Sequence, residues 1–171
     1  MKAIVIYKSK TGYTQKYAEW IAEELGCDIK ENASLSDIVD YDTVICGGGV
    51  YAGMVNGAKL IVKNLNRLSG KKLILFAVGA SKDEEKVTAP LWNRLLTEEQ
   101  QKNIACFYLR GGFDFSKLKG FDKLLMSMMK KQLQQQNSNP DDGLFGAFDN
   151  PVDYTERENI DKLIEYAKGQ G

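Results

Sequence analysis

The N-terminal stretch AIVIYKSKTGYTQKYAEWIAEEL, residues 3–25, carries the pattern that decides the fold. It begins with a short apolar, β-branched run, Ala3 to Lys8, that is typical of a buried strand. From Thr14 to Leu25 the apolar residues recur at helical spacing. Between the two lies SKTGYT, residues 9–14, which is rich in hydroxyl side chains. The stretch therefore predicts a strand, a polar turn and a helix.

This unit is repeated along the chain. Three more buried strands are predicted: DTVICGGG (42–49), KKLILFAVGA (71–80) and NIACFYLRGG (103–112). An edge strand is predicted at CDIKEN (27–32). Helices are predicted over 57–68 and 89–99, the second with Pro90 in its first turn. Continuously apolar strands that alternate with helices indicate a parallel sheet with both faces covered. We therefore expect a three-layer α/β/α sandwich with a five-stranded parallel sheet, in a single domain over residues 1–171.

The C-terminal part departs from this rhythm. A final helix is predicted over 155–168, with a capping box between Thr155 and Glu158. Its inner side is predicted to carry Ile160, Leu163, Ile164 and Ala167. Before it, residues 111–153 form an insert between the fifth strand and the last helix. Its amphipathic helix, 121–133, has one apolar face, made by Phe121, Leu124, Leu125, Met128, Met129 and Leu133 and widened by Met126. The polar and aromatic segments that follow, 132–143 and 144–151, are predicted as loop.

The amino-acid composition excludes several kinds of binding site and catalytic mechanism. Lys plus Arg and Asp plus Glu each total 23, so no net field draws in nucleic acid or a membrane surface. The chain has no histidine, which removes the commonest zinc ligand and the usual general base. Three scattered cysteines, Cys27, Cys46 and Cys106, suit reduced thiols and a cytoplasmic location. No targeting or transmembrane segment is recognised. Any chemistry is therefore expected to come from a cofactor.

The turn SKTGYT has the features of a phosphate cradle. Ser9, Thr11 and Thr14 offer hydroxyl donors, Gly12 permits close approach of the backbone, and a helix N-terminus follows. The turn is not a Walker A loop, because that motif needs two spaced glycines and a Lys-Ser/Thr pair. The competing interpretation is an ordinary helix-capping turn.

Two further loops follow predicted strands. GGGVYAGMVNG, residues 47–57, matches GxGxxA, but no acidic ribose ligand follows about 20 residues later. We interpret it instead as a flexible backbone that presents Tyr51 to a flat ring, and VGASKDEEK, residues 78–86, as closing over the same ring. Tyr51 as a simple surface aromatic remains the alternative.

These residues together resemble a known family. SKTGYT is similar to the FMN phosphate loop of flavodoxins, [ST]-x-T-G-x-T, and the strand order fits the flavodoxin-like fold, 2-1-3-4-5, over nearly the whole chain. The resemblance implies that FMN is the cofactor. It also implies that the phosphate is wrapped by Ser9, Lys10, Thr11, Gly12, Tyr13 and Thr14, and that the ring is flanked by Val50, Tyr51, Ala52 and Gly53 on one edge and by Gly79, Ala80 and Ser81 on the other.

The insert resembles that of flavodoxin-domain proteins related to menaquinone-dependent protoporphyrinogen dehydrogenases. It departs from them in its Gln/Asn-rich stretch. The resemblance implies flavin-mediated electron transfer, with protoporphyrinogen or a quinone as substrate. A flavodoxin-type carrier that docks to redox partner proteins is the alternative, which the zero net charge disfavours. A phosphate-binding module without flavin is a third reading. The position of the methionine-rich helix, 121–133, stays open: it packs inward, lies over the flavin, or contacts another subunit or a membrane surface.

Overall fold

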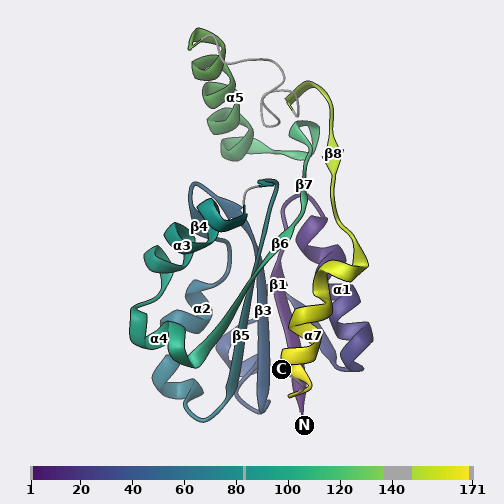
Figure 1. Ribbon diagram of the computed structural model, residues 1–171, viewed down its shortest axis with the longest axis vertical. Coiled ribbons are helices and arrows are strands. Elements are labelled where there is room, and N and C mark those ends of the chain that lie inside the picture. Colours follow the sequence, from purple (N-terminus) through teal and green to yellow (C-terminus); the bar gives the residue numbers. More distant parts are fainter. Residues whose placement is uncertain (1, 83, 137–147, 170–171) are drawn as a thin grey trace.

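The computed structural model describes residues 2–82, 84–136 and 148–169 (Figure 1). Its centre is a parallel sheet of five strands in the order β2-β1-β3-β5-β6, which confirms the predicted order. The strands are β1 (Ala3–Lys8), β2 (Asp28–Glu31), β3 (Thr43–Tyr51), β5 (Lys72–Gly79) and β6 (Ile104–Arg110). A short strand, β4 (Met54–Val55), pairs antiparallel with the end of β3. Sequence analysis did not predict β4.

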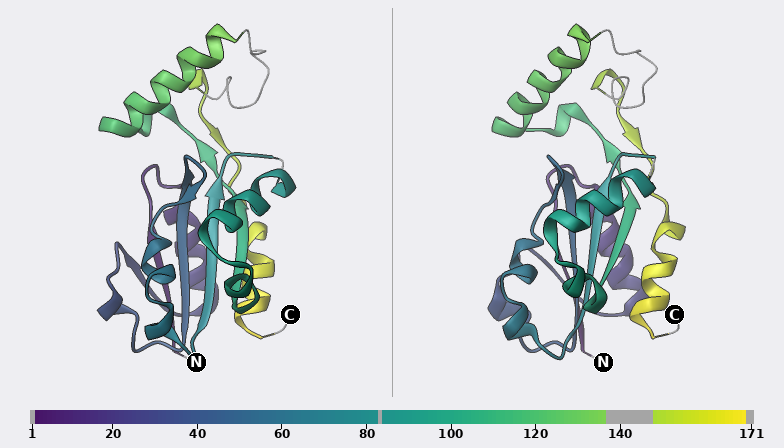
Figure 2. Two further views of the ribbon diagram at one scale, coloured as in Figure 1. Left: turned by 90° about the vertical axis from the view of Figure 1, so that its left-hand side faces the viewer. Right: turned by 60° about the vertical axis from the view of Figure 1, so that its left-hand side comes forward.

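Helices cover both faces of the sheet, as Figures 1 and 2 show. On one face lie α1 (Tyr13–Leu25) and α7 (Asp161–Ala167), and on the other lie α2 (Lys59–Val62), α3 (Glu84–Leu95) and α4 (Glu98–Asn103). Short 3₁₀ helices, η1 (Leu35–Asp37), η2 (Leu65–Leu68), η3 (Phe115–Lys117) and η4 (Arg157–Ile160), fill the connections. The architecture is therefore the predicted three-layer sandwich.

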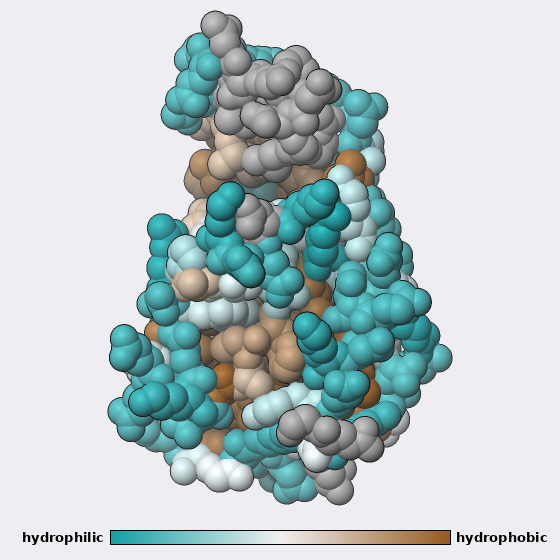
Figure 3. Space-filling view, viewed as in Figure 1, coloured by the Kyte–Doolittle hydropathy of each residue, from teal (hydrophilic) through white to brown (hydrophobic). Residues whose placement is uncertain are grey.

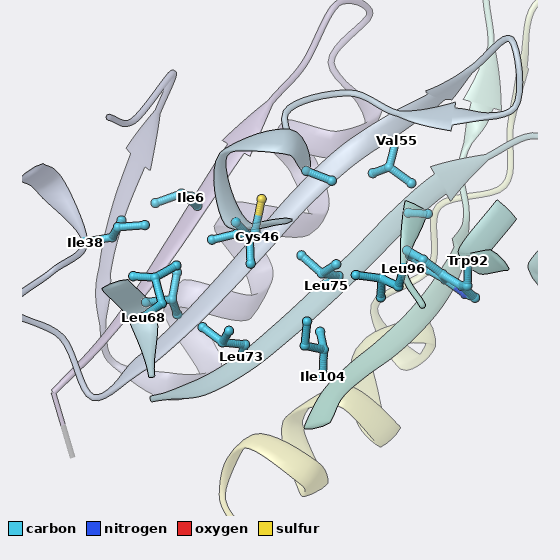
Figure 4. Packing of buried hydrophobic residues seen from close by; sticks show 14 of the residues in the cluster. Ile6, Ile38, Cys46, Val55, Leu68, Leu73, Leu75, Trp92, Leu96 and Ile104 are labelled. Carbon is cyan, nitrogen blue, oxygen red and sulfur yellow. The ribbon is translucent and has the colours of Figure 1, made fainter. Parts of the chain in front are cut away.

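Alternation along the strands divides the apolar residues between two cores. In β1, Ile4 and Ile6 join the core beneath α2 and α3, whereas Val5 and Tyr7 join the core beneath α1 and α7. Figure 4 shows the first of these cores, in which Cys46, Leu73 and Leu75 rise from the sheet toward the helices. Because both faces are buried, the strands read as continuous apolar runs.

Two predicted helices have different bounds in the structure. The helix expected over 57–68 is a single turn, α2, followed by η2. The helix expected over 89–99 begins earlier, as α3, so Pro90 lies inside it rather than in its first turn. A new helix, α4, starts after Thr97, because the Thr97 hydroxyl accepts from the Gln100 N–H and the Gln100 side chain accepts from the Thr97 N–H.

The last helix also begins differently. The predicted capping box at Thr155 is wrong, because the Thr155 hydroxyl and N–H both donate to Asp153 Oδ1. The chain then forms η4 before α7. The residues predicted to face inward are all buried: Ile160, Leu163, Ile164 and Ala167. The apolar spacing therefore predicted the buried face correctly but not the start of the helix.

The insert stands apart from the two cores. Its two ends pair as β7 (Gly112–Phe113) and β8 (Val152–Asp153), which are antiparallel and were not predicted. Beyond this pair, α5 (Gly120–Gln135) projects past the carboxyl ends of the sheet strands (Figures 1 and 2). The helix extends beyond its predicted end at residue 133 and includes residues 134 and 135, which were predicted only as loop. The loop prediction covered residues 132–151, and of these, residues 137–147 lie outside the described residues.

Candidate functional site

The three predicted loops meet around one cavity of about 370 Å³, at the carboxyl ends of β1, β3 and β5. Nine of the residues named from sequence line it: Thr11, Tyr13, Thr14, Val50, Tyr51, Ala52, Gly79, Ala80 and Ser81. Four do not line it: Ser9, Lys10, Gly12 and Gly53. Ligands of open parallel sheets bind at this kind of edge. We refer to this space as the loop cavity.

The first loop is built around the start of α1. Gly12 adopts a positive φ of 93°, and its N–H donates to Ser9 Oγ at 3.0 Å. Helix α1 has no side-chain cap, and Lys16 N–H is the first to reach the Gly12 carbonyl. The N–H groups of its first turn therefore remain open to an anion. Ser9 braces the turn rather than lining the cavity.

The second loop is not the flexible segment predicted from its glycines. Residues 47–51 belong to β3, and Ala52 and Gly53 form a two-residue hairpin turn with φ values of 49° and 72°. Glycine is needed in the strand for close packing, because a Cβ at Gly47 would lie 1.9 Å from the ring of Phe76. The GxGxxA match is therefore part of a strand and a hairpin. Gly53 lies under Arg94, away from the loop cavity.

Tyr51 sits where the first two loops meet. Lys10 Nζ lies 4.6 Å from the centroid of its ring, and the Tyr51 hydroxyl forms a hydrogen bond with the Thr11 side chain. Burial raises the pKa of Tyr51, so the phenol is neutral and presents an apolar, half-buried ring to the cavity. This arrangement suits stacking against a flat ligand.

Tyr108 completes the opposite wall and was not predicted. It rises from β6, and its hydroxyl donates to the Ser81 carbonyl at 3.3 Å. Gly79 has no room for a side chain there, because a Cβ would lie 2.5 Å from the Tyr108 hydroxyl. Burial raises the pKa of Tyr108. Only the pairing of β5 with β6 brings these residues together, so no local pattern points to Tyr108.

The insert covers the loop cavity. Its helix α5 contributes Asp122, Leu125, Met126 and Met129 to the lining. Lys10 Nζ donates to Asp122 Oδ2 at 2.5 Å, which links the first loop to the start of α5. Sequence analysis left the position of this helix open. The structure places part of it over the site.

Further lining residues also come from outside the predicted set: Gly49, Val78, Val87, Gly112, Phe113, Asp114 and Leu118. Asp114 is buried and carries a charge at this site. Its Oδ1 accepts from the Ser116 hydroxyl and N–H, which hold the pKa of the carboxyl below its usual range. It is thus an ionised cap of η3 rather than a proton donor.

The residues that the structure describes offer neither a metal centre nor a membrane-spanning helix. There, no group of three or more histidine, cysteine or acidic residues could hold a metal ion. None of the helices in residues 2–82, 84–136 and 148–169 is both long and apolar enough to cross a membrane. All three cysteines are free thiols, and burial raises the pKa of Cys46 to about 12.

The lining fits a flavin mononucleotide. An uncapped helix start with hydroxyl side chains suits a phosphate, and a tyrosine opposite small residues suits a planar ring. FMN carries both groups, and it supplies redox chemistry that this histidine-free chain lacks.

One protein family and several solved structures are similar to this chain. The family model of the flavodoxin domain matches residues 4–140. The flavodoxin, WrbA-like protein from Agrobacterium tumefaciens has a similar fold, with 17% identity, a TM-score of 0.50, and coverage of 78% of this chain and 98% of that one. A flavodoxin from Streptococcus pneumonia TIGR4 is 18% identical, with a TM-score of 0.44, and coverage of 80% and 99%. No curated protein sequence matches the chain.

The family match spans most of the chain, including the phosphate-cradle turn and the three strands that end at the loop cavity. The chain therefore belongs to the flavodoxin domain family, and its cofactor is FMN.

Proposed function

We propose that the protein is a cytoplasmic flavin-dependent oxidoreductase whose FMN occupies the loop cavity. In this proposal SKTGYT holds the phosphate, and the ring lies between Tyr51 and the Gly79–Ser81 segment. The observation that carries it is the convergence of these three loops on one cavity of about 370 Å³.

The protein's own groups supply placement rather than acid–base chemistry. The open N–H groups of α1 and the Thr14 hydroxyl bind the phosphate, and the hairpin at Ala52 sets the height of the Tyr51 ring. Bound flavin supplies the electron transfer. Thr14 is only 3% exposed, so its hydroxyl is oriented by packing before the ligand arrives.

An enzyme is favoured over an electron carrier. Leu125, Met126 and Met129 give the cavity an apolar ceiling, which suits an apolar substrate such as a quinone or a porphyrinogen. A carrier needs an open flavin edge and a steering charge, and this chain has zero net charge. The alternative function is a flavodoxin-type carrier, with a redox partner protein docking over α5.

A peripheral membrane contact of α5 is part of the same proposal. Phe121, Leu124 and Met128 are exposed on the helix. Lysines 119, 123, 130 and 131 accompany them along it. An apolar face bordered by lysines is typical of helices that lie on anionic membranes. Such a contact would bring a lipid-soluble quinone close to the cavity.

Substitution of Thr14 tests the FMN assignment. Thr14→Val keeps the shape and removes the hydroxyl, so we expect FMN to bind more weakly by about 1–3 kcal/mol, which is about 5- to 150-fold. Quenching of flavin fluorescence measures the dissociation constant. Thr14→Ser should recover most of the affinity, and Ser69→Ala, an exposed hydroxyl after η2, serves as the control. An unchanged affinity in Thr14→Val would show that the loop is misassigned.

Turnover assays separate the enzyme from the carrier. The FMN-loaded protein would be tested for NAD(P)H-to-quinone and protoporphyrinogen turnover, alongside reduction by a flavodoxin reductase. We expect turnover of at least one substrate. Turnover of neither, together with ready one-electron reduction, would support the carrier. Protein that is colourless and gains no flavin absorbance with added FMN would refute both.

A further inference from the structure

A second cavity, of about 490 Å³, runs along the outer edge of β6. Five consecutive residues of this strand, 106–110, line it, between α3 on one side and η4 and α7 on the other. Because β6 is the last strand of the sheet, this edge has no neighbouring strand. Figure 3 shows apolar surface in the middle of this face, between the polar surfaces of the flanking helices. We call this space the β6 cavity.

Cationic side chains from three separate elements reach the β6 cavity. They are Lys82 after β5, Arg110 at the end of β6 and Lys162 in α7. Arg110 is held in place by Tyr154, since its guanidinium carbon lies 3.5 Å from the centroid of that ring. A fixed guanidinium and two mobile ammonium groups are a common arrangement for binding phosphate.

Arg110 is also incompletely satisfied. Its Nε is buried and has no hydrogen-bond partner within the described ranges of the chain. A buried polar group without a partner destabilises a fold unless something compensates. Because this nitrogen is closed to solvent, a ligand in the cavity would instead contact the parts of Arg110 that line the cavity. The observation that points to an anionic ligand is therefore that Lys82, Arg110 and Lys162 line one cavity.

The other residues that line the β6 cavity indicate which class of ligand it could bind. Glu84 and Glu158 also border the cavity, and they would repel a bare inorganic anion. They can instead accept hydrogen bonds from sugar hydroxyls, as an acidic residue does in dinucleotide sites. Trp92 and Phe107 offer aromatic surface for a base. Phosphate, sugar and base together describe a nucleoside phosphate, and a cavity of about 490 Å³ is larger than an inorganic ion requires.

The β6 cavity adjoins the loop cavity. Ser81 and Tyr108 line both, and the Tyr108 hydroxyl donates to the Ser81 carbonyl in the wall between them. A ligand in one cavity is thus separated from a ligand in the other by these two residues.

We propose that the β6 cavity binds a nucleoside phosphate, and that this is the nucleotide portion of the molecule that exchanges electrons with the flavin. The second half of the proposal rests on the proposed function, but the first half does not. Arg110 binds the phosphate, Lys82 and Lys162 add charge around it, and the two glutamates accept from the sugar.

Calorimetric titration of the full chain with adenosine 5′-monophosphate tests the site. The protein is first saturated with FMN, so that the probe cannot enter the phosphate cradle. We expect wild-type protein to bind the probe, Arg110→Gln to weaken binding by about tenfold or more, and Lys162→Gln by about threefold. Adenosine and pyrophosphate should each bind more weakly than the complete nucleotide.

Arg67→Gln, an exposed arginine in η2, is the matched control and should leave the affinity unchanged. If Arg110→Gln fails to fold, the exposed Lys82→Gln and Lys162→Gln pair replaces it, with an expected combined loss of about tenfold. The proposal is overturned if wild-type protein binds no nucleotide, if Arg67→Gln weakens binding as much as Arg110→Gln, or if pyrophosphate binds as tightly as the nucleotide.

FMN affinity is measured on the same samples, which keeps the two proposals apart. Binding of FMN without binding of the nucleotide would remove the β6 site and leave the proposed function. Binding of the nucleotide without FMN would do the reverse.

Discussion

The parallel sheet and helix α5 of the insert contain the same types of large apolar residue, but the sheet buries them and α5 leaves several of them exposed. Phe76 in β5 is 0% exposed between β3 and the α1–α7 layer, whereas Phe121 in α5 is 75% exposed. Both lie in segments with the expected periodicity, strand in one case and helix in the other. The difference teaches that periodicity predicts which face of an element is apolar, but not whether anything covers that face.

The largest effect is expected when one phenylalanine in each region is replaced by alanine. Phe76→Ala should lower the free energy of unfolding by about 3–5 kcal/mol, because it opens a cavity in a closed core. Phe121→Ala should change it by no more than about 0.5 kcal/mol, because the ring is already in water. Urea denaturation measures both. A large loss in Phe121→Ala would mean that the face of α5 is covered in solution.

A smaller effect is expected at the junction between the two regions. The hydroxyl of the buried Tyr17 donates to the Arg110 carbonyl at 2.6 Å and accepts from Asn159 Nδ2 at 2.7 Å. Tyr17→Phe removes both hydrogen bonds inside a buried region, so we expect a loss of about 1–3 kcal/mol.

The matched control is Tyr166→Phe, since Tyr166 is an exposed tyrosine of α7. Thermal unfolding of both variants measures the difference. Equal stabilities would show that water replaces these hydrogen bonds, and that the chain leaving β6 is not held by Tyr17.

The smallest effect concerns the ion pair that joins the insert to the first loop. Lys10 and Asp122 are partly exposed, so a double-mutant cycle with Lys10→Met and Asp122→Asn should give about 0.2–1 kcal/mol, decreasing with salt. Amide hydrogen exchange in α5 is the sensitive measurement, because it detects local opening.

We expect exchange in α5 to become faster while exchange in β3 stays unchanged. Lys30→Met, which breaks a similar exposed pair with Asp37, should leave α5 unaffected. If α5 and β3 amides were equally protected in the wild type, the two regions would unfold as one unit and the comparison would fail.

Local chemistry explains what could be predicted. The apolar runs of β1, β3 and β5 have helices after them, and this alternation was enough to predict the class of the sheet. The turn SKTGYT was recognised because hydroxyl residues, a glycine and a helix start are contiguous. The glycines at 47–49 were assigned both to the end of a strand and to the start of a flexible loop. The sequence did not decide between the two, because the need for glycine at 47 and 48 comes from Phe76 and Asn56, which lie elsewhere in the sequence.

The chain by itself determined which segments become strands and helices, the two apolar faces of the sheet and the phosphate-cradle turn, because these depend on side-chain spacing and hydrogen bonds between near neighbours. Only the tertiary structure decided that Tyr108 faces Gly79, that α5 lies over the loop cavity and that Arg110 Nε has no partner among the described residues. Those features depend on distances between segments that are remote in sequence, and such distances are set when the layers pack.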